Sequence, residues 1–432
     1  MSSNKDKSLT TDDKEQTTVE NNKRRNFLRG AMAATGTAAA AVAAPIAAKA
    51  KEMNHSLHGG DVMKDADYGS MMYMDNHKMV PGNLIEPPGS PSPNDVKYKV
   101  FDIDVRIVKH EILPGIVTHV FAFNGQVPGP EFHVTEDDWV QVNFTNRTEE
   151  MHTIHWHGII LPYTMDGVPM VTQDPVHPGD TFVYRFQAKP AGTHWYHCHW
   201  STPLHAASAM HGAFIVHRKK EPLKKRFPYT RDYTLMLEAM DTNFIREEMN
   251  GLLEGMKEVN LLMSKGLLDY KTHGFFKDYK EFKQAVDSGE YVAPYLQSRS
   301  SGVNIEPNFF MINGKSYPAT KRIGIKQGEW IRVRFVNASG ISHHMHLHGH
   351  DFWWVAQDGN DLAEPRKLNT IHVEPGGTYD VMVYGDNPGF WTWHDHKTVH
   401  ARNNGIYPGG MLTVMAYEDF EPTYVPSVST DQ

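Results

Sequence analysis

The chain has 432 residues, of which 40% are hydrophobic and 22% are charged, as is typical of a globular protein with two or three domains. Its formal net charge of −8 argues against a nucleic-acid-binding protein that relies on a basic surface. Two counts stand out, 26 His and a single Cys. One Cys excludes an intrachain disulfide and a zinc site built from several thiolates, whereas abundant imidazole indicates transition-metal binding.

The first 50 residues are predicted to be an export signal rather than a domain. The sequence KRRNFL at 23–28 resembles a twin-arginine signal, and a weakly apolar, Ala-rich run follows at 31–48. Ala48 and Ala50 frame a small-residue cleavage site. We therefore assign 1–50 to a twin-arginine signal peptide and expect a periplasmic mature protein. We expect no membrane span, because no later segment approaches about 18 consecutive apolar residues.

Residues 51–95 are expected to form an irregular leader rich in Met and His. The segment interleaves these residues and ends in a Pro-rich stretch. Thioether and imidazole groups suit Cu(I), so the leader is either a copper-capture segment or a flexible tail without a metal role.

From about residue 97 onward, β-branched and polar residues alternate as they do in strands, which predicts an all-β fold. We expect β-domains at 96–220 and 304–420, a linker with a helical insert at 221–303, and a tail at 421–432. Within the linker, apolar residues recur at helical spacing over about 240–300, after a candidate N-cap at Asp241.

The two β-regions carry the same arrangement of histidines, which indicates an internal repeat. In each region, a box with three histidines at matching positions is followed by a second box with two histidines and then by one more histidine. The first copy contains His152, His155, His157, His197, His199 and His205, and the second contains His343, His346, His348, His394, His396 and His400.

The single thiol lies between two histidines. Because alternate side chains of a strand point to opposite faces, His197 and His199 should face one way and Cys198 the other. One strand can therefore serve two metal sites. His152, Cys198, His205 and Met210 together give two imidazoles, a thiolate and a thioether, which is the ligand set of a blue-copper (type 1) electron-transfer site.

With four His-x-His pairs, the chain resembles the multicopper oxidase family, whose domains are cupredoxin-like Greek-key β-barrels. The resemblance implies four copper ions per subunit: one type 1, one type 2 and two type 3. By motif order it implies type 2 ligands at His155 and His346. The same order implies type 3 ligands at His157, His197, His199, His348, His394 and His396. It also implies that Asp166, in an Asp-Gly pair, relays protons, although Asp-Gly is equally typical of a simple turn.

The second β-domain departs from the pattern at its thiol position, where Asp395 replaces Cys. Met411 follows His400 by eleven residues, whereas the first domain has five between His205 and Met210. We therefore interpret His343, Asp395 and His400 as a decayed type 1 site, in which Asp395→Cys alone would not restore blue copper. This pattern resembles the two-domain laccase-like oxidases with type 1 copper in domain 1.

The resemblance implies an oxidase that takes electrons from a phenolic or metal-ion donor and reduces O₂ to water. Two alternatives remain: a copper nitrite reductase, or a periplasmic copper-binding or resistance protein. The resemblance implies that the four His-x-His pairs together bind a trinuclear cluster, made of the type 2 copper and the type 3 pair. Because each domain supplies only two of the four pairs, we expect a homotrimer with these clusters at subunit interfaces. A cluster formed between the two domains of one chain is the alternative.

Overall fold

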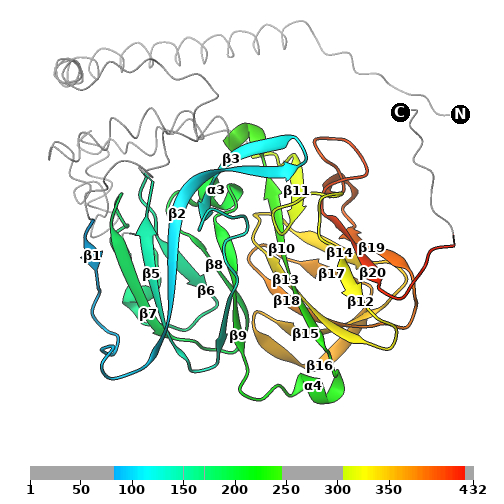
Figure 1. Ribbon diagram of the computed structural model, residues 1–432, viewed down its shortest axis with the longest axis horizontal. Coiled ribbons are helices and arrows are strands. Elements are labelled where there is room, and N and C mark those ends of the chain that lie inside the picture. The colour runs from blue at the N-terminus through cyan, green and yellow to red at the C-terminus, as the bar shows by residue number, and fades with distance from the viewer. Residues whose placement is uncertain (1–81, 149, 170, 246–304, 424–432) are drawn as a thin grey trace, which may run out of the picture. The chain divides into compact units, whose positions relative to one another are not determined.

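The computed structural model describes residues 82–148, 150–169, 171–245 and 305–423. These residues form two β-barrels, drawn in blue to green and in green to red in Figure 1. The all-β, cupredoxin-like architecture expected from the sequence is confirmed.

The first barrel packs a five-stranded sheet, in the order β1-β7-β5-β2-β3, against a four-stranded sheet, in the order β4-β9-β8-β6. The strands are β1 (Leu84–Ile85), β2 (Tyr98–Leu113), β3 (Ile116–Phe123), β4 (Phe132–Thr135), β5 (Trp139–Asn146), β6 (Ile154–His157), β7 (Thr181–Gln187), β8 (Gly192–Cys198) and β9 (His211–His217).

The second barrel packs a six-stranded sheet, in the order β11-β10-β13-β18-β15-β16, against a five-stranded sheet, in the order β12-β20-β19-β14-β17. The strands are β10 (Arg231–Met240), β11 (Phe309–Ile312), β12 (Ile323–Ile325), β13 (Trp330–Asn337), β14 (His343–Leu347), β15 (Phe352–Gln357), β16 (Asn360–Leu368), β17 (Thr370–Val373), β18 (Thr378–Tyr384), β19 (Phe390–Asp395) and β20 (Leu412–Tyr417).

Two strands lie outside the domain boundaries expected from the sequence. β10 falls in the expected linker at 221–303, yet it pairs in parallel with β13 and antiparallel with β11, so it belongs to the second barrel. β1 falls in the expected leader at 51–95 and pairs in parallel with β7 of the first barrel. Both strands form by pairing with strands far away in the sequence. The alternation of residues within a short segment does not reveal such pairing.

Helical structure among the described residues is short. The elements are η1 (Tyr163–Met165), α3 (Thr202–Ala207), α4 (Leu223–Arg226) and η4 (Thr398–His400). None of the helices in this part of the chain combines the length and hydropathy that a membrane crossing requires. Asp241 Oδ1 accepts the backbone N–H groups of Asn243 and Phe244, as an N-cap does. The expected signal and most of the expected leader and helical insert lie outside the described residues, as does the end of the tail.

A buried polar contact joins the barrels. The Thr193 hydroxyl donates to Asp380 Oδ1 at 2.6 Å and accepts from the Arg334 guanidinium at 2.6 Å. Burial alone would raise the pKa of Asp380, but Arg332 and Arg334 outweigh this effect and lower the pKa. Arg332 also contacts Asp380, so the buried carboxylate is balanced by two guanidinium groups.

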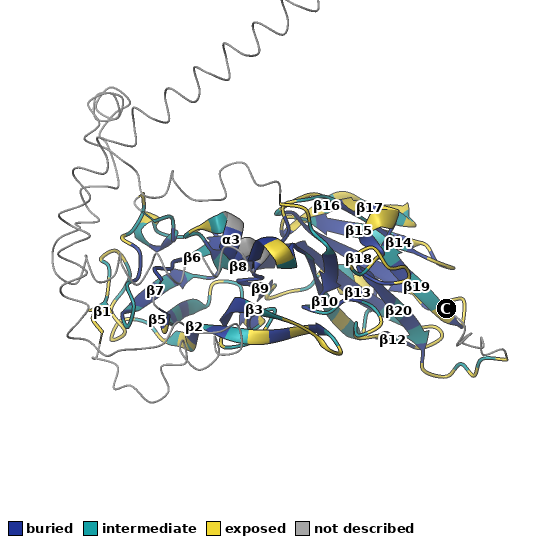
Figure 2. Cartoon of the chain, turned by 90° about the horizontal axis from the view of Figure 1, so that it is seen from above, coloured by how far each residue is buried: buried dark blue, intermediate teal, exposed yellow. Residues whose placement is uncertain are grey.

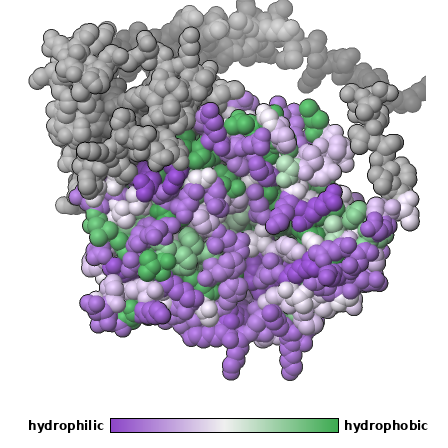
Figure 3. Space-filling view, in the orientation of Figure 1, coloured by the Kyte–Doolittle hydropathy of each residue, from purple (hydrophilic) through white to green (hydrophobic). Residues whose placement is uncertain are grey.

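Buried residues run along the strands of both barrels (Figure 2), and hydrophobic side chains make up the core of each. A smaller apolar cluster lies between the barrels and combines Trp195 of β8 with Met236 of β10 and Val336 of β13. On the face drawn in Figure 3, hydrophobic residues are interspersed among hydrophilic ones. The barrels therefore hold β8, β6, β14 and β19, which carry the histidine boxes, on well-packed scaffolds.

Candidate metal centres

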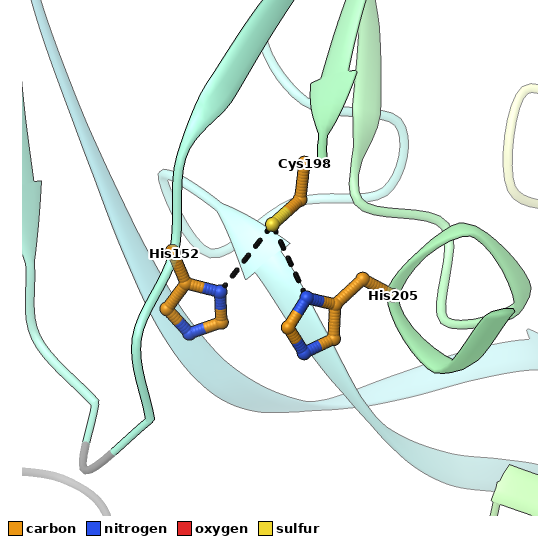
Figure 4. A group of neighbouring side chains, drawn as sticks. All are labelled: His152, Cys198 and His205. Atoms are coloured by element: carbon orange, nitrogen blue, oxygen red, sulfur yellow. Dashed lines mark hydrogen bonds between the residues drawn. The ribbon is translucent and has the colours of Figure 1, made fainter. Parts of the chain in front are cut away.

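Cys198 lies between two imidazoles in the interior of the first barrel (Figure 4). The thiol is at the end of β8, His152 immediately precedes β6, and His205 lies on α3. Cys198 Sγ is 3.6 Å from His152 Nδ1 and 3.1 Å from His205 Nδ1. All three side chains are buried, as is Met210, whose carbonyl accepts the Cys198 N–H. The structure thus brings the thiol and both imidazoles together, with the backbone of Met210 next to Cys198, as the sequence predicts.

The donors and spacing of this cluster fit a transition metal. Metal–N and metal–S bonds of about 2.0 and 2.3 Å place the two ligand atoms about 3.5 Å apart in a tetrahedral site. The observed separations between sulfur and nitrogen are close to that value without any rearrangement of the chain. A thiolate with two imidazoles and a nearby thioether is the donor set that selects copper.

Buried polar groups outside the cluster orient its imidazoles. Thr148 Oγ1 lies 2.9 Å from His152 Nε2 and is itself bonded to Asn146 Oδ1. Glu150 Oε2 lies 3.0 Å from His205 Nε2. Because these partners engage Nε2 of each ring, Nδ1 is directed at the sulfur.

The two imidazoles differ in their electrostatic environment. Burial, together with the positive charge of His205, holds the pKa of His152 well below its usual value. Burial also lowers the pKa of His205, but Glu150 and Cys198 outweigh this effect and raise it to about 10. Copper must therefore displace a proton from His205 when it binds to the metal-free chain.

Glu150 belongs to the surroundings of this candidate site, and the sequence analysis missed it. It lies in the loop before β6, where no periodicity marks it. Its position two residues before His152 was the available signal. Only the fold shows that it reaches His205, 55 positions away.

Four histidines of the first barrel gather on the opposite face of β8 and β6. His155 pairs with His197 across the two strands, while Ile154 pairs with Cys198. The His155 ring centroid is 5.8, 5.3 and 5.7 Å from those of His157, His197 and His199. Burial, which outweighs the adjacent carbonyl, lowers the pKa of His197 to about 3, so its imidazole is neutral and available to a metal.

The second barrel repeats this arrangement on β14 and β19. His346 pairs with His394, and Met345 pairs with Asp395, in the same register as in the first barrel. The His346 centroid is 4.9, 5.8 and 5.3 Å from those of His348, His394 and His396. The structure therefore gathers the eight predicted cluster ligands into two sets of four.

In both sets, backbone carbonyls fix the orientation of the rings. His155 Nδ1 donates to Asp166 O at 2.7 Å and His346 Nδ1 donates to Asn369 O at 2.8 Å. His197 and His394 donate in the same way to the carbonyl of the next residue, at 3.0 and 2.9 Å. With Nδ1 occupied, Nε2 of each ring carries the lone pair that a metal binds.

Among the residues that the structure describes, the ring contacts and hydrogen bonds of the eight histidines join members of the same set and none joins the set of one barrel to that of the other. Each set is by itself half of the ligand set that a trinuclear cluster of eight imidazoles needs.

Asp166 lies beside the first of these sets. Its backbone carbonyl anchors His155, and its carboxylate Oδ1 is 3.5 Å from His155 Nδ1. The side chain is about one-third exposed. Asp166 therefore occupies the rim of the half-site, with access to both solvent and a predicted ligand.

The expected decayed site of the second barrel is fully formed around Asp395. Asp395 Oδ2 accepts from His343 Nδ1 at 2.7 Å and from His400 Nδ1 at 2.5 Å. Burial alone would raise the pKa of Asp395, but the hydrogen bonds from both imidazoles hold it well below its usual value. All three side chains are buried.

One argument for decay, the spacing of Met411, is wrong. The Asp395 N–H donates to Met411 O at 3.0 Å and the Met411 N–H donates to His400 O at 2.9 Å. Cys198, Met210 and His205 make the same two bonds, at 3.1 and 3.0 Å. The extra residues form a loop at 401–410 that leaves Met411 in the position equivalent to that of Met210.

Comparison with known proteins connects these centres to a family. Two family models, each described as multicopper oxidase, match residues 104–221 and 292–408. The chain is 31% identical to copper resistance protein A of Escherichia coli over 270 residues, which are 60% of this chain and 42% of that protein. It is 26% identical to laccase-1 of Emericella nidulans over 332 residues, which are 68% of this chain and 53% of that protein. The chain thus spans about half the length of these curated relatives.

Solved structures match it over most of their length. The blue copper oxidase of Nitrosomonas europaea is 35% identical, with a TM-score of 0.60, and the match covers 76% of this chain and 89% of that one. The multicopper oxidase mgLAC is 33% identical, with a TM-score of 0.59, over 77% and 88% of the two chains. A copper nitrite reductase of Nitrosomonas europaea, 18% identical with a TM-score of 0.52 over 78% and 95%, shares the fold.

Cys198→Ser should abolish blue absorption and leave the two four-histidine sets able to load copper. A hydroxyl is a poor soft donor, whereas His197 and His199 face away from the sulfur. Visible absorption and copper content of the purified variant measure both effects. A blue band that survived the substitution would contradict the assignment of Cys198 as the thiolate ligand.

Proposed function

Because this chain belongs to the multicopper oxidase family, we propose that it is a laccase-like oxidase. It oxidises a phenolic or metal-ion donor by one electron at a time and reduces O₂ to water. Four electrons and four protons convert each O₂ into two waters, so four donor molecules are consumed per turnover. When bound, copper supplies one-electron redox chemistry at the mononuclear site and multi-electron chemistry toward O₂ at the cluster.

The observation that carries this proposal is the arrangement of β8. Its last residue presents the thiol to the buried His152–His205 pair, while the imidazole of His197 belongs to the four-histidine set. A few covalent bonds of one strand therefore connect the ligands of an electron-accepting site to those of an O₂-reducing site.

The resemblance to the family assigns the ligands of each copper. The type 1 ion is held by His152, Cys198, His205 and Met210, and the type 2 ion by His155 and His346. The type 3 pair is held by His157, His197, His199, His348, His394 and His396. The carbonyl anchors on His155 and His346 support this assignment, because they leave Nε2 of both rings free for the same ion.

The oxidase is distinguished from its rivals by steady-state measurements. We expect O₂ uptake with at least one donor among phenols, Cu(I), Fe(II) and Mn(II), and no reduction of nitrite. An oxygen electrode and a nitrite assay on the copper-loaded protein measure these activities. Nitrite reduction without O₂ uptake would establish the nitrite reductase instead, and full copper loading without turnover would indicate a copper-binding or resistance protein.

The Asp166 carboxylate serves as a proton relay at the rim of the half-site. O₂ reduction consumes protons, and this carboxylate is both near His155 and accessible to water. In Asp166→Asn, the backbone carbonyl that anchors His155 remains, so copper loading should be unchanged.

We expect Asp166→Asn to lower the rate of O₂ uptake by about 100-fold and to alter its pH profile, as loss of a positioned proton donor does. Reduction of the blue band by donor under anaerobic conditions should stay as fast as in the wild type. Asp174→Asn, an exposed carboxylate of the same loop, is the matched control. Equal O₂ uptake in both variants would contradict the relay.

The cluster is completed by a second copy of the chain, in a homotrimer. The two four-histidine sets make no mutual contact within the described chain, and a head-to-tail contact between copies closes as a ring. In the segment between β6 and Asp166, Ile160 and Tyr163 are 67% and 65% exposed. Beside the second set, a hollow of about 580 Å³ is lined by His346, Trp330, Trp353 and Tyr384. Exposed apolar groups on one half and an aromatic hollow on the other suit a subunit interface.

Subunit mixing tests this assembly. His155→Ala and His346→Ala chains should each be inactive, and reassembly of an equal mixture should restore activity to about one quarter of the interfaces, where two intact halves meet. O₂ uptake after dissociation and reassembly measures the recovery. As a control, mixing His155→Ala with His157→Ala should restore nothing, because both changes affect the first barrel. Full activity from a monomeric protein would contradict the shared cluster.

The protein acts in the periplasm, after export by the twin-arginine pathway. The KRRNFL sequence at 23–28 supports this localisation, and export in the folded state suits a protein that binds its metal before it crosses the membrane.

A further inference from the structure

The Asp395 site of the second barrel reproduces the scaffold of the Cys198 site residue by residue. The pairs of equivalent residues, first barrel before second, are Asn146 and Asn337, Thr148 and Ser339, His152 and His343, Cys198 and Asp395, His205 and His400, and Met210 and Met411. Each pair makes the same hydrogen bond in its own barrel. The second site therefore retains the construction of a metal site.

The hydrogen bonds behind His343 are those of a metal-ligating imidazole. Ser339 Oγ lies 2.8 Å from His343 Nε2 and 2.8 Å from Asn337 Oδ1. When the hydroxyl donates its only hydrogen to Asn337, its lone pair can accept the Nε2–H of His343. In the metal-free chain the Nδ1–H of His343 donates to Asp395 Oδ2. When a cation replaces that hydrogen, Ser339 can accept the Nε2–H instead, so that Nδ1 offers its lone pair to the metal.

The Asp395 carboxylate is held so that one oxygen is available as a ligand. Oδ1 accepts the N–H groups of His344 and Lys397, both at 2.9 Å. Oδ2 faces His343 and His400, and one ligand atom from each of these three residues lies within 4.8 Å of the others. The first site has a carboxylate that the second lacks: Glu150, which contacts His205, is replaced by Ile341 at the equivalent position. The second site thus has its single carboxylate inside the ligand set instead of outside it.

We propose that His343, Asp395 and His400 bind a divalent cation such as Cu²⁺, Zn²⁺ or Co²⁺, with Met411 as a weak fourth neighbour. Two imidazoles and a carboxylate suit cations of this hardness, and without a thiolate in the ligand set the site lacks the intense blue band of a copper–thiolate bond. The ion is additional to the four coppers of the proposed oxidase.

Binding requires a small expansion of the site. In the metal-free chain, the hydrogen bonds from the two imidazoles draw Oδ2 to 2.7 and 2.5 Å from the nitrogens. Bonds of about 2.0 to 2.1 Å to a tetrahedral cation require ligand atoms about 3.3 Å apart. The cation takes the place of the Nδ1 hydrogens. His343 then keeps one proton on Nε2, and Ser339 Oγ accepts a hydrogen bond from this Nε2–H.

Metal content provides the direct test. After loading with Cu²⁺ and removal of excess metal, wild-type protein should hold one more ion per chain than Asp395→Asn or His400→Ala. His400 lies on η4, away from the cluster ligands, so its variant removes a ligand without changing β19. Asp386→Asn, at a carboxylate that is 65% exposed, is the matched control and should retain the wild-type content. Equal copper content in the wild type and in both site variants, with the blue band intact, would overturn Cu²⁺ as the bound ion and leave Co²⁺ as the deciding probe.

The Asp395→Cys variant tests the scaffold independently. Since Met411 occupies the position equivalent to that of Met210, this single change should add a second blue site, contrary to what residue spacing alone predicts. We expect the blue absorption per chain to rise by about twofold in the copper-loaded variant. No additional blue absorption, together with an intact first blue site, would show that the second scaffold does not hold a metal.

These outcomes are independent of the oxidase activity. If Cu²⁺ leaves the site empty, Co²⁺ is added to the copper-loaded protein as a second probe. The wild type should then show ligand-field absorption that Asp395→Asn lacks. Absence of this absorption, together with equal copper content, would overturn the site even if O₂ uptake is as proposed.

Discussion

The alternation of side chains along β8 is the constraint on which the metal chemistry of this protein depends. His197 lies on one face of the strand and Cys198 on the other, and the pairing of His155 with His197 fixes the register of β6 against β8. Because the period of a strand is two residues, a slip of one residue would turn Cys198 toward the four-histidine set and an imidazole toward the thiolate site. The packed core of the first barrel holds this register. The fold therefore keeps the two ligand sets on opposite faces of one strand, with only a few covalent bonds between them.

The chain prepares its ligands by occupying the other nitrogen of each ring. Backbone carbonyls hold Nδ1 in the two four-histidine sets, whereas Thr148 and Glu150 hold Nε2 in the thiolate site. The free nitrogen is thus Nε2 where a cluster lies beyond the strand surface and Nδ1 where a single ion lies in the barrel interior. Every such bond also satisfies a polar group whose burial alone would be unfavourable.

The sequence revealed those parts of the sites that depend on local alternation. The His-x-His pairs and the opposing thiol were predictable because two residues on one face of a strand remain neighbours in any β-fold. The position of Met411 was not, because the length of the loop at 401–410 does not alter where the flanking backbone returns. Glu150 and β10 were missed for a related reason: their partners lie 55 positions away and in another strand region, and no local pattern encodes such contacts.

The two barrels keep the same scaffold and differ in which barrel can accept electrons. A thiolate stabilises Cu(I) and Cu(II) with little change in geometry, whereas a carboxylate is a hard ligand that favours the divalent state. With the single Cys198 in the first barrel and Asp395 in the second, only the first barrel has the thiolate through which electrons would enter the proposed oxidase. Each site has one buried carboxylate, but in a different place. In the first barrel it is Glu150, which contacts the outer nitrogen of His205, and in the second, where Ile341 replaces Glu150, it is Asp395 at the ligand position. The second barrel retains the architecture of an electron-transfer site while its ligand chemistry is that of a redox-inactive one.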